Sequence, residues 1–266
     1  MNDDIRKLVE DMDDSGAGND ETALKTDEFV KNTIKSCRLF TEPADTVKYY
    51  GKDRRDFWND DSDEVMLLCQ FFNNAIVSGD PGSVEIARTG FEQLSEKDDE
   101  MLFDVIGSVL LRHIDPDGII ELFDPEKQPE FRRYNLAVAA KTHPEILDEE
   151  RRNMIFDSLK KRMKALIKDN PPETCAVFDE ALILAEFGDS RAIPLLRRYA
   201  VMLLEPSEAE YSMLEDRAKS GEKIEPKEEL TPSMMLWEVC NEIETLGGVA
   251  DDIKAKNPFG HMLYNY

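Results

Sequence analysis

Seven basic side chains fall between residues 151 and 168, and their type and spacing suggest a binding chemistry. They are Arg151, Arg152, Lys160, Lys161, Arg162, Lys164 and Lys168. Guanidinium and ammonium groups bind carboxylates and phosphates. The set predicts a positive strip that contacts an acidic peptide or a single-stranded phosphate polymer. No aromatic residue lies between Lys160 and Lys168 for bases to stack on, which makes the nucleic-acid alternative weaker.

The strip lies on a helix that we expect over 145–169. Its apolar stripe is Ile155, Leu159, Met163 and Leu166. Much of the basic set projects away from this stripe at helical spacing, and Arg197 and Arg198, with Arg132 and Arg133, could lie nearby if the helices stack. Two readings stay open: a surface for a partner, or a solvated face that pairs with the acidic ends of the chain itself.

The charge of the chain is strongly negative and unevenly distributed. With 57 acidic and 33 basic residues, the net charge is −24. The region 130–200 is nearly neutral, whereas 1–129 and 201–266 are acidic. Such a surface repels phosphate backbones, so duplex nucleic acid is an improbable partner. A second hypothesis is an acidic inhibitor of the immunity-protein type, which covers a basic partner with its acidic segments 1–64 and 205–229.

Catalytic and metal-binding patterns are scarce. The sequence has no Gly-x-Ser-x-Gly, no His-Glu-x-x-His and no phosphate-binding loop with lysine. A metal-dependent hydrolase in a helical bundle would need Glu-x-x-His pairs, and none is present. His113 ends an apolar helix, where we expect it to bond carbonyl groups; His143 precedes Pro144 in a turn, and His261 lies near the C-terminus. We expect no enzyme activity, no cofactor and no metal.

One partial match to a calcium loop lies near the N-terminus. Asp11, Asp13, Ser15 and Gly16 occupy positions one, three, five and six of an EF-hand loop. Position twelve should be a bidentate glutamate, but it is Thr22. We interpret the segment as an acidic flexible tail.

The apolar periodicity predicts an all-α chain. We expect an acidic flexible tail over 1–21, then a helix and an aromatic-rich cap over 22–61 that holds Tyr49, Tyr50, Phe57 and Trp58. A helical domain follows over 62–247, with a charged linker near 220–230, and a C-terminal tail over 248–266. The expected helices include 129–142, 145–169, the pair 173–187 and 190–204, and helices that start at Ser207 and at Thr231-Pro232.

Two stretches share a helix end, a Gly-Asp turn and a new amphipathic helix. The first is Ala75 to Arg88 with Gly79-Asp80, and the second is Ala185 to Leu196 with Gly188-Asp189. Glycine can leave a helix in the left-handed conformation, and the aspartate can cap the next helix.

These stretches, around 75–94 and 182–204, resemble HEAT-type helical repeats. The resemblance implies a HEAT-like α-solenoid of stacked antiparallel helix pairs whose surface binds a protein or another polymer, without catalytic residues. The intervals between the copies are irregular, so a degenerate solenoid and a helical domain with repeat-like parts both fit.

Cysteine use and hydropathy favour a cytoplasmic protein. No apolar run approaches the length of a membrane span, and the acidic start of the chain lacks the apolar core of a secretory signal. The cysteines, Cys37, Cys69, Cys175 and Cys240, are widely spaced. We interpret them as small core residues in a reducing compartment, over the alternative of a disulfide pair.

Overall fold

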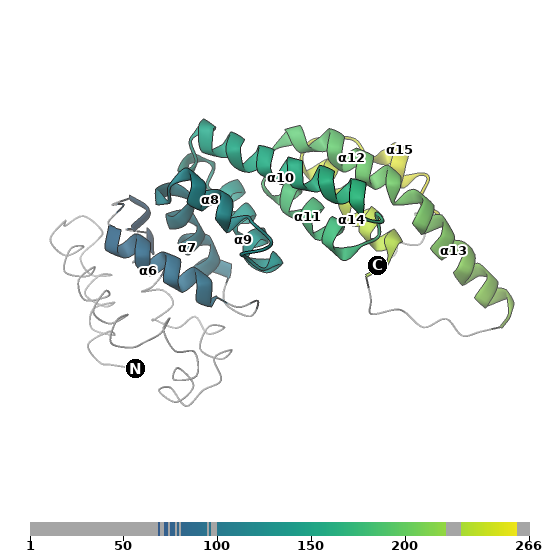
Figure 1. Ribbon diagram of the computed structural model, residues 1–266. Coiled ribbons are helices and arrows are strands. Elements are labelled where there is room, and N and C mark those ends of the chain that lie inside the picture. The colour runs from purple at the N-terminus through teal and green to yellow at the C-terminus, as the bar shows by residue number, and fades with distance from the viewer. Residues whose placement is uncertain are drawn as a thin grey trace, which may run out of the picture. The chain divides into compact units, whose positions relative to one another are not determined.

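The structure is a computed structural model that describes residues 69, 72–73, 75–77, 79, 81–94, 96, 100–221 and 230–259. Within these ranges the regular elements are helices, and none is a strand (Figure 1). The predicted all-α class is therefore confirmed. The predictions for 1–21, with its partial calcium loop, and for 22–61, with its aromatic cap, lie outside the described residues. The chain divides into two compact units, Met1–Asp148 and Glu149–Tyr266, whereas we expected one domain over 62–247.

The first unit is organised around one buried helix. Its elements are α6 (Pro81–Gln93), α7 (Glu100–His113), α8 (Pro116–Leu122), α9 (Glu130–Thr142) and the short 3-10 helix η1 (Pro144–Ile146). Helix α7 packs against both α6 and α9, and its residues from Leu102 to Leu111 are buried except Asp104, which is half-buried. The wide apolar arc of this segment predicts such burial, because a helix that is apolar over most of its circumference needs neighbours on several sides.

Local chemistry in the first unit agrees with the sequence patterns. Asp115 caps α8, since its Oδ1 accepts a hydrogen bond of 2.8 Å from the backbone N–H of Gly118. Gly79 has φ of +62°, as predicted for the end of a helix. The imidazole of His113 lies against Gly79, and its Nε2 donates a hydrogen bond of 2.9 Å to the carbonyl oxygen of Ile76. This confirms that His113 satisfies a helix-end carbonyl.

The second unit is organised around α14. Its elements are α10 (Glu149–Asp169), α11 (Cys175–Glu186), η2 (Ser190–Ala192), α12 (Ile193–Met202), α13 (Leu204–Lys219), α14 (Pro232–Thr245) and α15 (Asp251–Lys254). Helix α14 packs against α11, α12 and α13, and buries a stripe of Met235, Leu236, Val239, Cys240 and Ile243. Thr231 caps its start, and Gly247 with φ of +84° follows its end. Both boundaries agree with the prediction.

The second Gly-Asp turn has the predicted geometry but not the predicted packing. Gly188 has φ of +75°, and the Asp189 side chain accepts a hydrogen bond from the N–H of Arg191. The turn joins α11 to α12, yet α12 packs mainly against α14, which follows it by thirty residues. Because α14 fills the position beside both helices, α11 and α12 do not form the self-contained pair that we expected.

The start of α13 differs from the capping-box prediction. We expected the helix to begin at Ser207, but it begins at Leu204, and Ser207 lies inside it and is fully buried. The backbone stays helical through Leu203, so the N–H of Ser207 already bonds the carbonyl of Leu203 at 3.1 Å. Pro206 lacks an N–H and interrupts the helical ladder there, which separates α12 from α13.

The C-terminal residues are packed up to the end of the described range. We expected a tail from 248, but Ala250, Ile253 and Asn257 are buried. The cysteines also differ in part from expectation. Cys69 and Cys240 are buried, but Cys175 is exposed at the first position of α11, so the core interpretation is wrong for that residue.

We predict that Gly79→Ala lowers the free energy of unfolding by about 2 kcal/mol, through the left-handed backbone and a clash. A β-carbon at this position would lie 2.8 Å from Cε1 of His113. Gly221→Ala is the matched control, because Gly221 has φ of +80° but no atom within 4 Å of such a carbon. Gly221→Ala should lower the free energy of unfolding by only about 1 kcal/mol. Urea unfolding checks both variants, and equal losses would contradict the clash with His113.

Candidate protein-binding surface

Helix α10 carries all seven basic residues of the predicted strip and buries one side. The buried residues are Ile155, Phe156, Leu159, Met163 and Ile167. Helix α10 packs against α11 and also contacts α12. The predicted helix over 145–169 is thus observed from Glu149, and Leu166, which we assigned to the apolar stripe, is half-buried.

The burial of α10 separates the basic strip into two groups. At about 100° per residue, Lys160, Lys161, Lys164 and Lys168 lie within an arc of roughly 100°, in which Lys160 borders the buried side and the other three face away from it. Lys161, Lys164 and Lys168 are exposed, and Lys160 is half-buried. We call these four residues the lysine face. Arg151 and Arg162 lie toward one flank of the helix, Arg152 lies in line with Leu159 on the buried side, and all three are half-buried.

The lysine face concentrates like charge along one line. Lys160, Lys164 and Lys168 follow one another at intervals of four residues, so each meets the next on the helix surface. Within the described part of the chain, Lys161, Lys164 and Lys168 form no ion pair. Each like-charge pair at this spacing destabilises a helix by about 0.2–0.5 kcal/mol. The position of Lys168 in the last turn of α10 offsets part of this, because the helix dipole favours a cation there.

Arg162 has a structural partner. Its Nη1 lies 3.2 Å from Oε1 of Glu180 on α11, and the Glu180 side chain is only 2% exposed. A carboxylate so deeply buried needs a cation close by, because an isolated charge in the protein interior is strongly unfavourable. Arg162 therefore neutralises Glu180 between α10 and α11, and it belongs to the core of the second unit.

Phe156 and Phe187 hold three further cations over their rings. The guanidinium of Arg152 lies 5.4 Å from the ring centroid of Phe187. Phe156 contacts two cations: the Arg191 guanidinium at 4.3 Å and the Lys160 ammonium at 5.2 Å from its ring centroid. These cation–π contacts attach one end of the lysine face to the η2 turn.

Arg191 was not among the predicted site residues, although it contacts the same Phe156 ring as Lys160. It also pairs with Asp189, whose Oδ2 is 2.5 Å from its Nη2. Burial alone would raise the pKa of Asp189. The hydrogen bonds from the side chain and backbone of Arg191 outweigh this effect, so the pKa of Asp189 lies below its usual value. The position of Arg191 directly after the Gly-Asp turn was the signal in the sequence that could have identified this residue.

Arg197 and Arg198 lie on α12 and differ in environment. Arg197 binds the C-terminal segment: its Nη2 is 2.9 Å from Oδ2 of Asp252, and its Nη1 donates a hydrogen bond to the carbonyl of Val249. The hydrogen bonds from Arg197 to the Asp252 carboxylate hold the pKa of Asp252 below its usual value. Arg198 is exposed. Arg132 and Arg133 belong to α9 in the first unit, where Arg132 bonds the carbonyls of Glu92 and Leu94 at the end of α6.

The described histidines have hydrogen-bond partners in the first unit. His143 lies between two carboxylates: its Nε2 is 2.8 Å from Oδ2 of Asp104, and its Nδ1 is 3.6 Å from Oε1 of Glu145. The two carboxylates meet opposite nitrogens of the ring and do not converge on one point. In the described ranges, no group of three or more His, Cys, Asp or Glu residues could hold a metal ion.

Comparisons of the chain with protein-family models, with curated proteins and with solved structures find no match. The resemblance to HEAT-type repeats stays a prediction. None of the helices in the described part of the chain has the length and apolar character needed to cross a membrane.

We predict that Arg162→Met lowers the free energy of unfolding by about 3 kcal/mol, because it leaves the Glu180 carboxylate buried without its cation. The double variant Arg162→Met with Glu180→Leu should recover most of this loss, since both charges are then absent. Urea unfolding followed by circular dichroism measures both. Equal destabilisation of the single and the double variant would contradict the role assigned to this pair.

Proposed function

We propose that this protein is a non-enzymatic scaffold or adaptor that binds an acidic segment of another protein through the lysine face of α10. The observation that carries the proposal is the unneutralised line of Lys160, Lys164 and Lys168. Acidic residues are abundant in this chain, which has 57 of them, yet lysine occupies all three positions. A glutamate or aspartate at any one of them would remove the repulsion between neighbouring lysines on the helix. An acidic partner relieves the same repulsion when it binds.

The distribution of the other cations supports this assignment. Arg162, Arg152 and Arg197 contact carboxylates or aromatic rings of the second unit, whereas within the lysine face only Lys160 contacts a ring, that of Phe156. Lysine ammonium groups on flexible stems suit an adaptable, strongly salt-dependent contact with carboxylates. An extended acidic peptide is a better partner than duplex nucleic acid, because the chain as a whole has a net charge of −24.

The proposed scaffold is a degenerate HEAT-like array, and its proposed location is the cytoplasm. The left-handed glycines Gly79 and Gly188, each followed by aspartate in the sequence, support repeat-like helix connections. The packing of α14 against α11, α12 and α13 favours a helical domain with repeat-like parts over a strictly regular stack. Free thiols at Cys69, Cys175 and Cys240 are compatible with a reducing compartment.

We predict that Lys164→Glu stabilises the protein while it abolishes binding. The new carboxylate would face Lys160 and Lys168, so two repulsions become attractions, and the free energy of unfolding should rise by about 0.5 kcal/mol. Affinity for a fluorescein-labelled oligoglutamate peptide at about 50 mM salt should fall at least about tenfold. Thermal unfolding by circular dichroism and fluorescence anisotropy measure the two effects.

Lys256→Glu is the charge-matched control, because Lys256 is exposed, lies outside α10 and gives the same change in net charge. It should leave oligoglutamate binding unchanged. An equal loss of affinity in both variants would show that only the total charge matters. Tighter binding of oligothymidylate than of oligoglutamate to the unmodified protein would favour a single-stranded phosphate polymer and contradict the proposal.

A further inference from the structure

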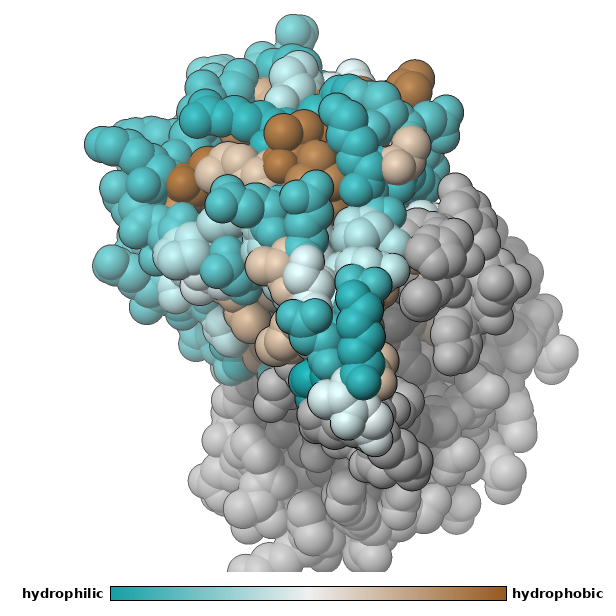
Figure 2. Space-filling model, turned by 90° about the vertical axis from the view of Figure 1, so that its right-hand side faces the viewer, coloured by the Kyte–Doolittle hydropathy of each residue, from teal (hydrophilic) through white to brown (hydrophobic). Residues whose placement is uncertain are grey.

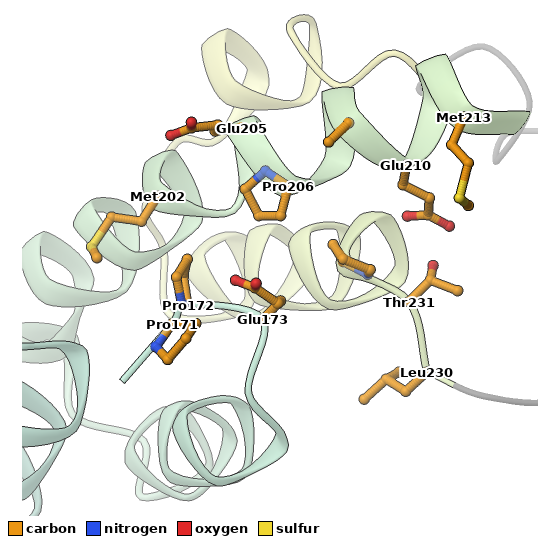
Figure 3. A pocket seen from close by; sticks show the side chains of 12 residues that line it. Pro171, Pro172, Glu173, Met202, Glu205, Pro206, Glu210, Met213, Leu230 and Thr231 are labelled. Atoms are coloured by element: carbon orange, nitrogen blue, oxygen red, sulfur yellow. The ribbon is translucent and has the colours of Figure 1, made fainter. Parts of the chain in front are cut away.

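A pocket lies in the second unit where three segments meet. It has a volume of about 650 Å³ and lies between the α10–α11 loop, the first half of α13 and the start of α14 (Figure 3). Eight of the twelve lining residues are apolar, and three are glutamates. The main apolar ones are Pro171, Pro172, Met202, Pro206, Met213 and Leu230. No lysine, arginine or histidine lines it. The pocket therefore combines apolar walls with negative charge.

The walls of the pocket are held in place before any ligand binds. The buried Tyr199 donates a hydrogen bond of 2.8 Å from its hydroxyl to the carbonyl of Pro172. Thr174 bonds the carbonyl of Pro171 through its hydroxyl at 2.8 Å. The two consecutive prolines restrict the backbone of this loop further. A preformed pocket loses less conformational entropy on binding than a flexible one.

Apolar side chains remain uncovered at the rim of the pocket. Met213 is 44% exposed and Leu230 is 41% exposed. The surface in Figure 2 is mostly hydrophilic, and apolar side chains gather on it in small areas. Helix α13 extends beyond the helices against which it packs, as Figure 1 shows. Methionine is flexible and polarizable, so it adapts to apolar partners of different shape.

One of the three glutamates, Glu173, lies in the α10–α11 loop, and the other two, Glu205 and Glu210, lie on α13. Glu210 has a structural role, since its Oε2 accepts a hydrogen bond of 3.1 Å from the backbone N–H of Ser233 at the start of α14. Glu173 and Glu205 are exposed and form no ion pair within the part of the chain that the structure describes. Their carboxylates lie on separate segments, the α10–α11 loop and the first turn of α13. A ligand that meets both must therefore carry positive charges at separated positions.

We propose that this pocket binds a short segment of a partner protein in which an apolar side chain is flanked by lysine or arginine residues. The apolar side chain enters between the prolines and Met213, and the flanking cations approach Glu173 and Glu205. Charge complementarity supports this occupant: the region 201–266 is acidic overall, and no basic side chain lines the pocket. The pocket is distinct from the lysine face of α10. The chain would therefore bind a basic segment in the pocket and an acidic segment on the lysine face.

The test uses a labelled nonapeptide with leucine and methionine at its centre and two basic residues on each side. Two comparison peptides replace the central residues by serine or the basic residues by glutamine. In fluorescence anisotropy at about 150 mM salt, where exposed charges are screened beyond about 8 Å, we expect the first peptide to bind at least about tenfold more tightly than either comparison peptide. Equal binding of the serine peptide would overturn the proposal, because attraction to the net charge alone would then suffice.

Two tryptophan variants test the location. Ala209 lines the pocket, so Ala209→Trp fills it and should weaken the nonapeptide at least about tenfold. Ala218→Trp is the matched control, because Ala218 is also exposed on α13. It lies nine residues after Ala209, which places it on the opposite side of the helix. It should bind the peptide as the unmodified protein does. Equal affinities of the two variants would overturn the proposal.

A second pair of variants tests the charges at exposed positions, where folding is unaffected. Glu173→Gln with Glu205→Gln should weaken the nonapeptide about fivefold, whereas Asp216→Asn with Glu238→Gln, also exposed but outside the pocket, should not. Circular dichroism confirms that all variants are folded. Sedimentation is the final check: concentration-dependent self-association that Ala209→Trp abolishes, without peptide binding, would show that a second copy occupies the pocket and would overturn the proposal.

Discussion

The burial of α14 among α11, α12 and α13 is the constraint on which the second unit depends. Five residues of α14, from Met235 to Ile243, leave water on folding, and burial of this apolar stripe favours the packing of α11, α12 and α13 around it. Helix α14 starts at Pro232 and packs against α13, and Leu230 and Thr231, which directly precede it, line the same pocket as Pro171 and Pro172. The walls of the pocket are thus a consequence of how this one helix is covered.

The same packing determines which charges of α10 are available to a partner. Helix α10 turns Ile155, Leu159 and Met163 toward the core of the unit, so Lys161, Lys164 and Lys168 lie on the exposed side and Lys160 lies at its border. Arg162 is near the edge of the buried arc, where it meets Glu180. Two residues of the same charge, Arg162 and Lys161, therefore differ in what they do: one neutralises a buried carboxylate, and its neighbour stays in water, where a surface charge contributes little to stability.

Opposite charges at two sites give a physical basis for an adaptor. The lysine face presents ammonium groups along α10, and the pocket presents Glu173 and Glu205 around apolar walls. On the proposed function, each site would attract partners that the other repels, which would provide specificity without high affinity. The cations of Arg152, Arg191 and Arg197 are occupied by aromatic rings and carboxylates, so they stabilise the unit that carries both sites.

The sequence by itself determined the helices, several of their ends and the presence of a basic strip. Gly79, Gly188, Asp115 and Thr231 act through neighbours a few residues away, so their roles can be read from local spacing. The start of α13 was predicted wrongly because Leu203 continues the helical backbone, which the capping pattern around Ser207 does not reveal.

Only the tertiary structure decided which basic residues remain free and where a pocket forms. The contacts of Arg162 with Glu180 and of Arg197 with Asp252 join residues far apart in the chain, and Pro172 and Pro206 line one pocket. Helical periodicity specifies which side of a helix is apolar, but it does not specify the partner helix. The neutralisation of a charge and the closure of a pocket depend on that partner, because both arise from atoms brought together by packing.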